Sequence, residues 1–285
     1  MTEQDISDIA EVIPEVNAPS YTLYHGDCLV EMDKIPDKSV DMVLCDLPYG
    51  TTKCKWDVII PLEQLWRRYK RICKTESAIV LTASQPFTSI LLLSNINGFS
   101  HELIWDKGRG SEPALAKLRP QKSHESVLVF SPTGKNPKYY PQMIKRDNPV
   151  TKKGNYSNDG QGIISGSGVI EKEYTHRYPT SVIKVTNSNQ SGKSHPTQKP
   201  VALLEYLIRT YTHKGMTILD NTMGSGSTGV ACANTGRNFI GIELYPLPDR
   251  PIDKRENPNY FFDAEKRIAE AYARPRQIQL GDMTA

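Results

Sequence analysis

The chain has 285 residues, of which 38% are hydrophobic and 24% are charged, and its formal net charge is +3. This balance excludes a disordered or fibrous protein and predicts a soluble globular protein, built as one large domain with an insertion. The five cysteines form no C-x-x-C pair, which argues against a zinc site and for a reducing compartment. There is no signal-peptide pattern and no apolar run of membrane-spanning length, so a cytoplasmic location is expected.

The chain begins with an acidic segment, residues 1–19, which has no regular pattern and is expected to be a flexible arm. Structure is expected from Ser20, with a strand over Tyr21–Tyr24 and then a turn and a short amphipathic segment. Asp27 lies at this turn, where an aspartate often caps the amino end of a helix.

The next expected strand, Ser39–Cys45, runs directly into the sequence Asp46-Leu47-Pro48-Tyr49-Gly50. Asp46 can accept a hydrogen bond from an amino group, and a backbone carbonyl just after it can accept a second one. The ring of Tyr49 offers a face on which a base can stack. The pattern therefore suits a planar amine, and the alternative is a strand that ends in a proline turn without chemical function.

Strands and helices alternate over the following residues. Residues 51–56 are polar, with two lysines, and predict a mobile loop beside the Asp46 sequence. A helix is expected after Pro61, a buried strand over Ala78–Thr82 and a helical segment over Pro86–Leu93. This alternation predicts a largely parallel sheet covered by helices on both faces.

Two further strands are expected over Glu102–Trp105 and Ser126–Phe130. No helix-length pattern separates them, so an antiparallel pair at the edge of the sheet is predicted. The loop between them, Lys107–Lys122, is basic and includes Arg109. Its charges either contact phosphate groups or belong to a solvated turn.

The region from Lys135 to His195 has no hydrophobic periodicity and is rich in Gly, Asn, Ser, Pro and Tyr. It carries 10 basic and 4 acidic residues, a net charge of +6 in a chain whose total is +3. Such a local excess is typical of a surface that binds a polyanion, and the tyrosines can stack or wedge. The alternative is a flexible, solvated insertion.

A glycine-rich turn follows a short buried strand, Met216–Asp220. Residues 224–229 match G-x-G-x-x-G, a turn that lets the backbone approach a nucleoside-bearing ligand at the amino end of a helix. The next strand, Asn238–Glu243, ends in a carboxylate 19 residues after Gly224. This is the spacing expected for an acid that binds ribose hydroxyls, so the two strands predict a nucleoside-cofactor site.

A proline-bounded loop, His195–Pro200, precedes this cofactor strand and a mostly buried helix over Val201–Arg209. Its polar residues can hydrogen-bond a charged part of such a cofactor, and Lys199 can pair with a cofactor carboxylate. The alternative is a loop that only caps the helix. A last helix is expected over Tyr260–Ala273, before a frayed tail.

Three of these segments carry a family resemblance. The D-L-P-Y sequence at residues 46–49 and L-D-N-T-M-G-S-G-S-T-G at residues 219–229 resemble the catalytic and cofactor motifs of the S-adenosylmethionine-dependent DNA amino-methyltransferases. H-P-T-Q-K-P at residues 195–200 resembles a third motif, and the motif order is that of the permuted beta subgroup. The resemblance covers roughly residues 20–272 and has one departure, Leu47, where the family more often has proline. The backbone carbonyl survives that change.

The resemblance implies an α/β fold, a Rossmann-like, doubly wound and mostly parallel seven-stranded sheet with a small irregular target-recognition insertion. The implied organisation is an arm over residues 1–19, a catalytic half over 20–134, the insertion over 135–194, a cofactor half over 195–273 and a tail over 274–285. The insertion is short, which predicts a short recognition site or loose specificity.

The resemblance also implies roles for individual residues. The expected catalytic residues are Asp46, Leu47, Pro48 and Tyr49. The residues expected to bind S-adenosylmethionine are Asp27, Thr197, Gln198, Lys199, Asp220, Thr222, Gly224, Gly226, Ser227 and Glu243, with Asp27 contacting either the cofactor or the target base if it does not cap a helix. The basic residues expected to contact DNA are Lys53, Arg109, Lys145, Arg146, Lys152, Lys153 and Arg177, and no metal is required.

The implied reaction is direct methyl transfer from S-adenosylmethionine to an amine of a base flipped out of double-stranded DNA. Adenine N6 is favoured over cytosine N4, because cytosine-type relatives more often begin the catalytic tetrapeptide with Ser. The alternatives are an N4-cytosine enzyme, an inactive DNA-binding relative, an NAD-dependent oxidoreductase and a protein or RNA methyltransferase.

The oligomeric state and the biological setting are less defined by the sequence, and both a monomer and a homodimer stay open. Restriction-linked, solitary and phage-borne enzymes would share these motifs, and the compact length favours a phage or prophage setting.

Overall fold

The structure is a computed structural model that describes residues 18–51, 57–111, 113–155, 169–186, 198–244 and 260–274. The chain divides into two compact units: unit 1 is Met1–Tyr140 with Val182–Ala285, and unit 2 is Pro141–Ser181. The predictions of an N-terminal arm, a loop over residues 51–56 and a C-terminal tail fall almost entirely outside the described residues.

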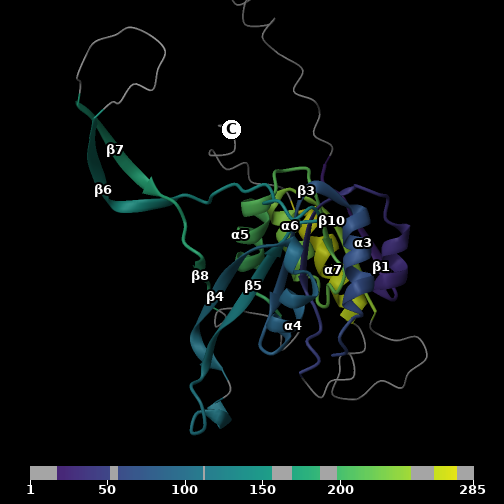
Figure 1. Ribbon diagram of the computed structural model, residues 1–285. Coiled ribbons are helices and arrows are strands. Elements are labelled where there is room, and N and C mark those ends of the chain that lie inside the picture. Colours follow the sequence, from purple (N-terminus) through teal and green to yellow (C-terminus); the bar gives the residue numbers. More distant parts are fainter. Residues whose placement is uncertain are drawn as a thin grey trace, which may run out of the picture. The chain divides into compact units, whose positions relative to one another are not determined.

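Unit 1 is built around a sheet of eight strands in the order β1-β10-β9-β2-β3-β5-β4-β8 (Figure 1). Each pairing is parallel except those of β5, which is antiparallel to both β3 and β4. The predicted α/β fold with a mostly parallel sheet is therefore confirmed, with eight strands in place of seven. The strands are β1 (Tyr21–His25), β2 (Val40–Asp46), β3 (Cys73–Ala83), β4 (Phe99–Ser111), β5 (Lys122–Phe130), β8 (Val182–Lys184), β9 (Thr217–Asp220) and β10 (Asn238–Glu243).

Helices pack on both faces of this sheet. Side chains alternate between the faces of a strand, so Met42 and Leu44 of β2 join one core cluster while Val43 and Cys45 join the other. The first cluster includes residues of α5 (Val201–Tyr211), α6 (Ser227–Thr235) and α7 (Tyr260–Ala273), and the second includes residues of α2 (Cys28–Glu31), α3 (Leu62–Ile72) and α4 (Phe87–Ser94). Short 3₁₀ turns lie at Met32–Lys34, Ile96–Gly98 and Pro113–Leu115. Burial on both faces explains why the strands read as continuous apolar runs.

The carboxyl ends of the parallel strands meet along one edge of the sheet. β2 and β9 pair directly, through Met42 with Ile218 and Val43 with Leu219. The residues that follow these two strands, from Asp46 and from Asp220, therefore lie side by side although they are far apart in the sequence. In open α/β sheets this edge is where ligands bind.

The edge of the sheet next to β4 differs from the prediction. β8 pairs in parallel with β4, through Trp105 with Ile183, so the antiparallel pair β4–β5 is not the edge that the sequence predicted. The indole Nε1 of Trp105 donates a hydrogen bond to the carbonyl of Val185 over 2.8 Å and fixes the added strand. Three residues are too few to show a periodic pattern, which is why β8 was missed.

Unit 2 contains an antiparallel pair, β6 (Ile144–Asn155) and β7 (Val169–Arg177). The prediction that the insertion is irregular is wrong for these residues. Facing pairs such as Lys145 with His176 and Thr151 with Glu173 are polar on both strands. The side chains of the two strands whose burial is described are exposed, apart from the half-buried Arg146, and a strand without a buried face has no regular alternation of apolar and polar residues from which it could be predicted.

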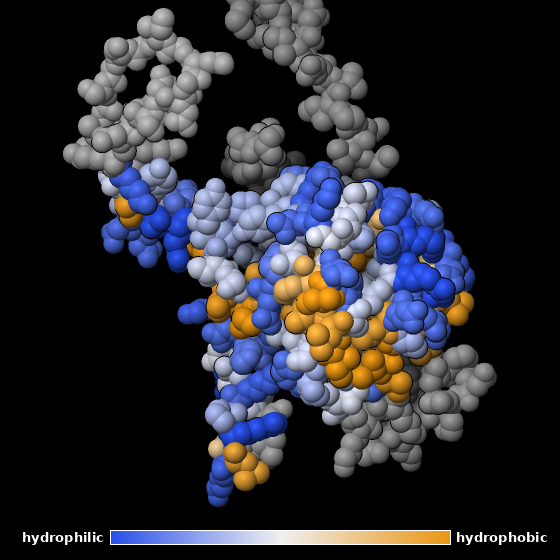
Figure 2. All heavy atoms as spheres, in the orientation of Figure 1, coloured by the Kyte–Doolittle hydropathy of each residue, from blue (hydrophilic) through white to orange (hydrophobic). Residues whose placement is uncertain are grey.

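The surface of the protein is mixed in polarity. Figure 2 shows a mostly hydrophilic face with an area where hydrophobic residues gather. Large apolar side chains that are exposed include Ile90, Leu93 and Ile96, on α4 and the turn after it. Among the helices that the structure describes, none is both long and apolar enough to cross a bilayer.

Candidate active site

The carboxylate of Asp46 lies at the end of β2 and is held by three donors from three parts of unit 1. Its Oδ1 atom accepts hydrogen bonds from the hydroxyls of Tyr49 and Thr82, each over 2.5 Å. Its Oδ2 atom accepts one from the ammonium of Lys199 over 2.7 Å. Thr82 faces Asp46 because it is its register partner on β3. The side chain of Asp46 keeps 32% of its surface exposed, so a ligand can still reach it.

Lys199 lies between two carboxylates. Besides Asp46, its ammonium is 3.1 Å from Oε2 of Glu125, and Oε1 of Glu125 pairs with Lys107 over 3.0 Å. Both ammonium groups also lie near the indole of Trp105, at 5.9 Å and 5.8 Å from the ring centroid. Two cations and two carboxylates thus alternate in a row, Lys107–Glu125–Lys199–Asp46, which is buried except at Asp46 and balances its own charge.

The pKa values in this row follow from these contacts. Burial acts to lower the pKa of Lys199, but the charges of Asp46 and Glu125 outweigh it and hold the pKa well above its usual value. Burial acts to raise the pKa of Glu125, but Lys199 and Lys107 hold it below its usual value. Burial, and then the charge of Asp46, raise the pKa of Tyr49. Lys199 is therefore an ammonium, Glu125 a carboxylate and Tyr49 a neutral phenol at neutral pH.

The remaining residues of the D-L-P-Y sequence have distinct surroundings. The ring of Tyr49 stacks on Phe87 with the centroids 5.3 Å apart, and the ammonium of Lys199 lies 5.9 Å from its centroid. The side chain of Leu47 is buried in the core, so only its backbone is available for chemistry. Pro48 is half-buried.

The glycine-rich turn lies between β9 and α6. Gly224 and Gly226 both have positive φ, +50° and +76°, which explains why glycine is needed there. A Cβ on Gly224 would meet nothing within 4 Å, whereas one on Gly226 would lie 3.0 Å from Ala264 and Ile268 of α7. One glycine thus opens a space at the turn, and the other lets α6 pack on α7.

Acidic side chains flank this turn. Oε2 of Glu243, at the end of β10, accepts a hydrogen bond from the backbone N–H of Gly224 over 2.8 Å. Asp220 accepts one from the backbone N–H of Thr222 over 3.1 Å and another from the hydroxyl of Thr228 over 2.6 Å. Burial raises the pKa of Asp220 to about 7, although these hydrogen bonds act to lower it.

The turn and the Asp46 loop are directly connected. The hydroxyl of Thr222 donates a hydrogen bond to the backbone carbonyl of Asp46 over 3.1 Å. Beneath them, the Oδ1 atom of Asn221 accepts from the thiol of Cys45 and the hydroxyl of Tyr69, over 2.8 Å and 2.5 Å. These bonds join the two motifs into one rigid site.

The space at the turn suits the nucleoside-bearing cofactor that the sequence predicts. It is open beside Gly224 and next to the carboxylate of Glu243. At the start of α6, the hydroxyl of Ser227 is buried and finds no hydrogen-bond partner in the described part of the chain. Buried polar atoms normally have partners, so an unsatisfied hydroxyl here is consistent with a missing ligand.

The other predicted cofactor residues are placed as follows. Asp27 caps α2, its Oδ1 accepting from the backbone N–H of Leu29 over 2.8 Å, so the capping alternative is realised. Gln198 is half-buried beside Lys199. Lys199 pairs with Asp46 and Glu125, and its pairing with a cofactor carboxylate stays a prediction. Thr197 lies outside the described residues.

The predicted DNA-contacting residues are divided between the two units. Arg109 is exposed on β4 in unit 1, where the β4–β5 hairpin extends past the end of β3 (Figure 1). Lys145, Lys152 and Arg177 are exposed on the strands of unit 2, where Arg146 is half-buried and Lys153 lies on β6. Lys53 lies outside the described residues.

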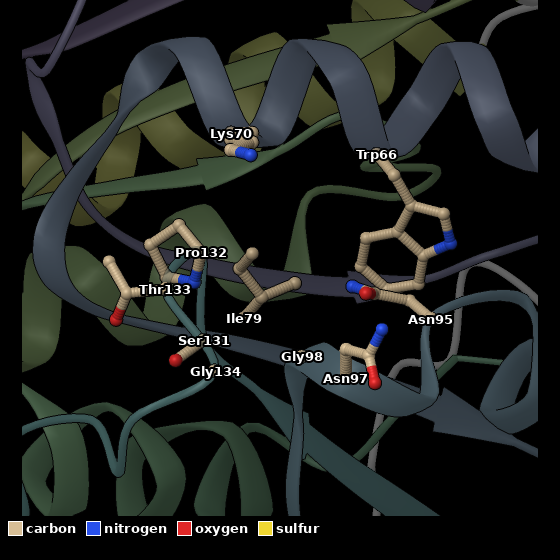
Figure 3. Close-up of a pocket in the computed structure, with 10 residues that line it drawn as sticks. All are labelled: Trp66, Lys70, Ile79, Asn95, Asn97, Gly98, Ser131, Pro132, Thr133 and Gly134. Atoms are coloured by element: carbon tan, nitrogen blue, oxygen red, sulfur yellow. The ribbon is translucent and has the colours of Figure 1, made fainter.

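Two surface hollows lie away from this constellation. One, of about 230 Å³, is lined by residues that include Trp66, Lys70 and Ser131 (Figure 3). The other, of about 280 Å³, is lined by residues that include Asp41 and Met216. Both adjoin the amino ends of parallel strands, and neither contains a predicted site residue.

The sequence did not identify Thr82, Lys107 or Glu125 as site residues. Each lies in or beside a predicted strand, and Glu125 directly precedes the apolar run of β5. A charged residue at the end of a buried strand was the available signal. Within the described part of the chain, no group of three or more His, Cys, Asp or Glu residues is arranged to bind a metal ion.

Comparison with protein families gives a match to N6_N4_Mtase, described as DNA methylase, over residues 40–246. Among curated proteins, the DNA adenine methyltransferase YhdJ of Escherichia coli (strain K12) is 28% identical over 239 residues, which cover 78% of each chain. The type II methyltransferase M1.MboII of Moraxella bovis is 25% identical over 240 residues, covering 78% of this chain and 91% of that protein.

Solved structures share the fold. The complex of M1.HpyAVI with SAM superposes with a TM-score of 0.55 at 23% identity, covering 87% of this chain and 98% of that one. The PvuII DNA methyltransferase (cytosine-N4-specific) gives a TM-score of 0.60 at 18% identity, covering 89% and 94%.

Proposed function

Because the chain belongs to the N6_N4_Mtase family of DNA methylases, we propose that it transfers a methyl group from S-adenosylmethionine to the N6 amine of adenine in DNA. The family confirms the predicted class, a DNA amino-methyltransferase, and its predicted cofactor, S-adenosylmethionine. It also sets aside the oxidoreductase alternative. The choice of adenine is the finer part of the proposal.

One observation supports this function most directly. The carboxylate of Asp46 lies partly exposed beside the glycine turn, and the hydroxyl of Thr222 joins the two motifs. A hydrogen-bond acceptor for an amine is thereby held next to the open space at Gly224. Methyl transfer needs two reactants held in attack geometry, and much of the rate enhancement comes from such positioning.

The proposed cofactor residues surround the turn. Glu243 would bind ribose hydroxyls, and Gly224 and Gly226 would let the backbone approach the nucleoside. The hydroxyl of Ser227 would hydrogen-bond the cofactor at the start of α6. Asp220, Thr222, Gln198, Lys199 and Thr197 complete the proposed set, from which Asp27 is removed because it caps α2. When bound, S-adenosylmethionine supplies the methyl group on its sulfonium.

Asp46 has the central role in the proposed mechanism. The target base leaves the duplex at a cost of a few kcal/mol, and the ring of Tyr49 receives it by stacking. Asp46 and a backbone carbonyl of the Leu47-Pro48 pair accept the two amine hydrogens. These hydrogen bonds localise the nitrogen lone pair, which is otherwise delocalised into the ring. The amine would then be oriented toward the methyl group that the sulfonium supplies, the bond from that carbon to sulfur would break as the bond to nitrogen forms, and a proton would leave the amine by way of Asp46 or directly to water.

Adenine is proposed because the catalytic tetrapeptide begins with Asp46. One relative at 28% identity is a DNA adenine methyltransferase, which supports the choice. The N4-cytosine alternative stays open, since a structure of similar fold belongs to a cytosine-N4-specific enzyme. Both amines can donate two hydrogens to the same acceptors.

In each unit we propose DNA-contacting residues, which are Lys53 and Arg109 in unit 1 and Lys145, Arg146, Lys152, Lys153 and Arg177 in unit 2, with residues 135–194 as the target-recognition region. Lysine and arginine contacts to phosphates supply most of the affinity but little of the sequence specificity. A type II relative supports a restriction-modification setting. The phage or prophage setting stays a prediction.

The direct test is incubation of the purified protein with S-adenosylmethionine and unmethylated genomic DNA, then digestion to nucleosides and mass spectrometry. N6-methyladenine that is lost in Asp46→Ala is the expected result. N4-methylcytosine would overturn the choice of base but keep the mechanism. DNA and cofactor binding without any methylated base would favour the inactive-relative alternative.

A further inference from the structure

The carboxylate of Asp46 is more fully engaged than an acceptor of a target amine needs to be. Two hydroxyls bond to its Oδ1 atom, and the ammonium of Lys199 is 2.7 Å from Oδ2. An incoming amine must therefore share Oδ2 with a full positive charge. A charged donor is a much stronger competitor than a neutral amine, and its charge weakens the carboxylate as an acceptor.

A second carboxylate, that of Glu125, lies close enough to bind the ammonium of Lys199. Oε2 of Glu125 is 3.1 Å from the Nζ atom of Lys199, yet it is buried and accepts no hydrogen bond within the described part of the chain. The two atoms are close but not aligned for a hydrogen bond. A small rotation of the Lys199 side chain would therefore form a hydrogen bond from its ammonium to Oε2 of Glu125. The other oxygen of Glu125 is held by Lys107 over 3.0 Å, so the carboxylate is already positioned.

We propose that Glu125 is a positioning residue that draws Lys199 away from Asp46 when the target amine enters. This inference rests on the proposed function. In the structure Lys199 occupies the resting position between the two carboxylates. As the amine approaches, the ammonium transfers its hydrogen bond from Oδ2 of Asp46 to Oε2 of Glu125, and Oδ2 becomes free for the amine.

The exchange of partners should cost little free energy, because of the charges that surround Lys199. The side chains of Lys199, Glu125 and Lys107 are only 11%, 16% and 12% exposed, so a buried ammonium without a carboxylate would be costly. In the exchange Lys199 never loses a carboxylate partner, because both lie within reach at the start. The elevated pKa of Lys199, which Asp46 and Glu125 maintain against burial, keeps it charged throughout.

The electrostatic consequence of removing Glu125 is specific. With a neutral amide at residue 125, Lys199 would have a single carboxylate partner, Asp46, and Lys107 would have none in this row. Lys199 would then bind Asp46 more tightly and compete better with the amine. The defect would lie mainly in the chemical step, because Lys199 is the one proposed cofactor residue for which the described structure gives a contact with Glu125, and Lys199 would keep its charge.

The test is a double-mutant cycle with Glu125→Gln, Lys199→Gln and both together, measured as kcat and KM at saturating DNA. We expect Glu125→Gln to lower kcat at least tenfold while KM for S-adenosylmethionine stays within about twofold. Lys199→Gln raises that KM, but adding it to Glu125→Gln should recover kcat, because the competing ammonium is gone. Glu102→Gln, which changes an exposed carboxylate on β4, is the matched control.

A kcat of Glu125→Gln within twofold of the wild type would overturn the inference, and so would a double variant with lower kcat than Glu125→Gln. Glu125→Asp covers the case in which Glu125→Gln does not fold. It keeps the buried charge but withdraws the carboxylate, so kcat should fall several-fold with KM unchanged. The assay counts either methylated base. Absence of any methylation in the folded wild type would instead refute the proposed function, and this inference with it.

Discussion

The hydroxyl of Thr222 donates a hydrogen bond to the backbone carbonyl of Asp46 over 3.1 Å. The two residues are 176 positions apart in the sequence, and they meet because β2 and β9 are neighbours in the sheet. The bond couples the position of the proposed catalytic carboxylate to that of the glycine turn. The two halves of the site therefore form one unit.

Thr222→Val should lower kcat/KM by about fivefold, because one neutral hydrogen bond contributes roughly 1 kcal/mol. Valine has nearly the shape of threonine, so the fold should persist. Steady-state kinetics and a thermal melt would measure both effects. Thr235→Val is the control, since that hydroxyl bonds only within α6. Equal losses in the two variants would show that the Thr222 bond has no special role.

The glycines of the turn should respond differently to alanine. At Gly224 the added Cβ enters open space, so Gly224→Ala should cost about 1 kcal/mol of stability from its positive φ and weaken S-adenosylmethionine binding at least tenfold. At Gly226 the Cβ meets Ala264 and Ile268, so Gly226→Ala should destabilise the fold more. Calorimetric titration and thermal melts would separate the two. A fully stable Gly226→Ala variant would contradict the packing argument.

The raised pKa of Asp220 predicts that the stability of the protein depends on pH. This pKa is raised by burial to about 7, against about 4 in an unfolded chain. Between these values the folded state binds more protons than the unfolded state, so the free energy of unfolding should fall as the pH rises from 4 to 7. Asp220→Asn should remove this contribution and flatten the profile. Urea titrations at several pH values would test it, and an unchanged slope would contradict it.

Tyr49 should act mainly through its ring. Tyr49→Phe removes the hydrogen bond to Asp46 but keeps the stacking surface, and kcat should fall only a few-fold. Tyr49→Ala removes the surface, and base–aromatic stacking is worth about 1–3 kcal/mol. The fluorescence of 2-aminopurine at the target position would report the flipped base. Equal loss of that signal in both variants would assign the role to the hydroxyl.

Basic residues should contribute to DNA affinity without sequence preference. Arg109→Ala in unit 1 and Lys152→Ala in unit 2 should each reduce the slope of log K against log salt by about one. Lys266→Ala, an exposed lysine on α7, provides the control. Fluorescence anisotropy with specific and unrelated duplexes would measure the slopes. A loss confined to the specific duplex would mean that the side chain reads bases.

The sequence predicted most secondary structure of unit 1 correctly. The last helix has the predicted bounds, Tyr260–Ala273, and the strand ending in Glu243 matches as well. Each of these elements buries one face, and the residues on a buried face are apolar, so apolar residues recur in the sequence at a regular spacing. β8 and the hairpin of unit 2 were missed because three residues, or strands polar on both faces, carry no such period.

The sequence by itself determined the family, because the catalytic and cofactor motifs are local and depend on backbone shape and spacing. It therefore named Asp46, Gly224 and Glu243 as site residues. Only the tertiary structure decided what holds the carboxylate. Thr82, Lys199 and Glu125 reach the Asp46 region from separate segments, and their proximity depends on strand order and register, which no local pattern records.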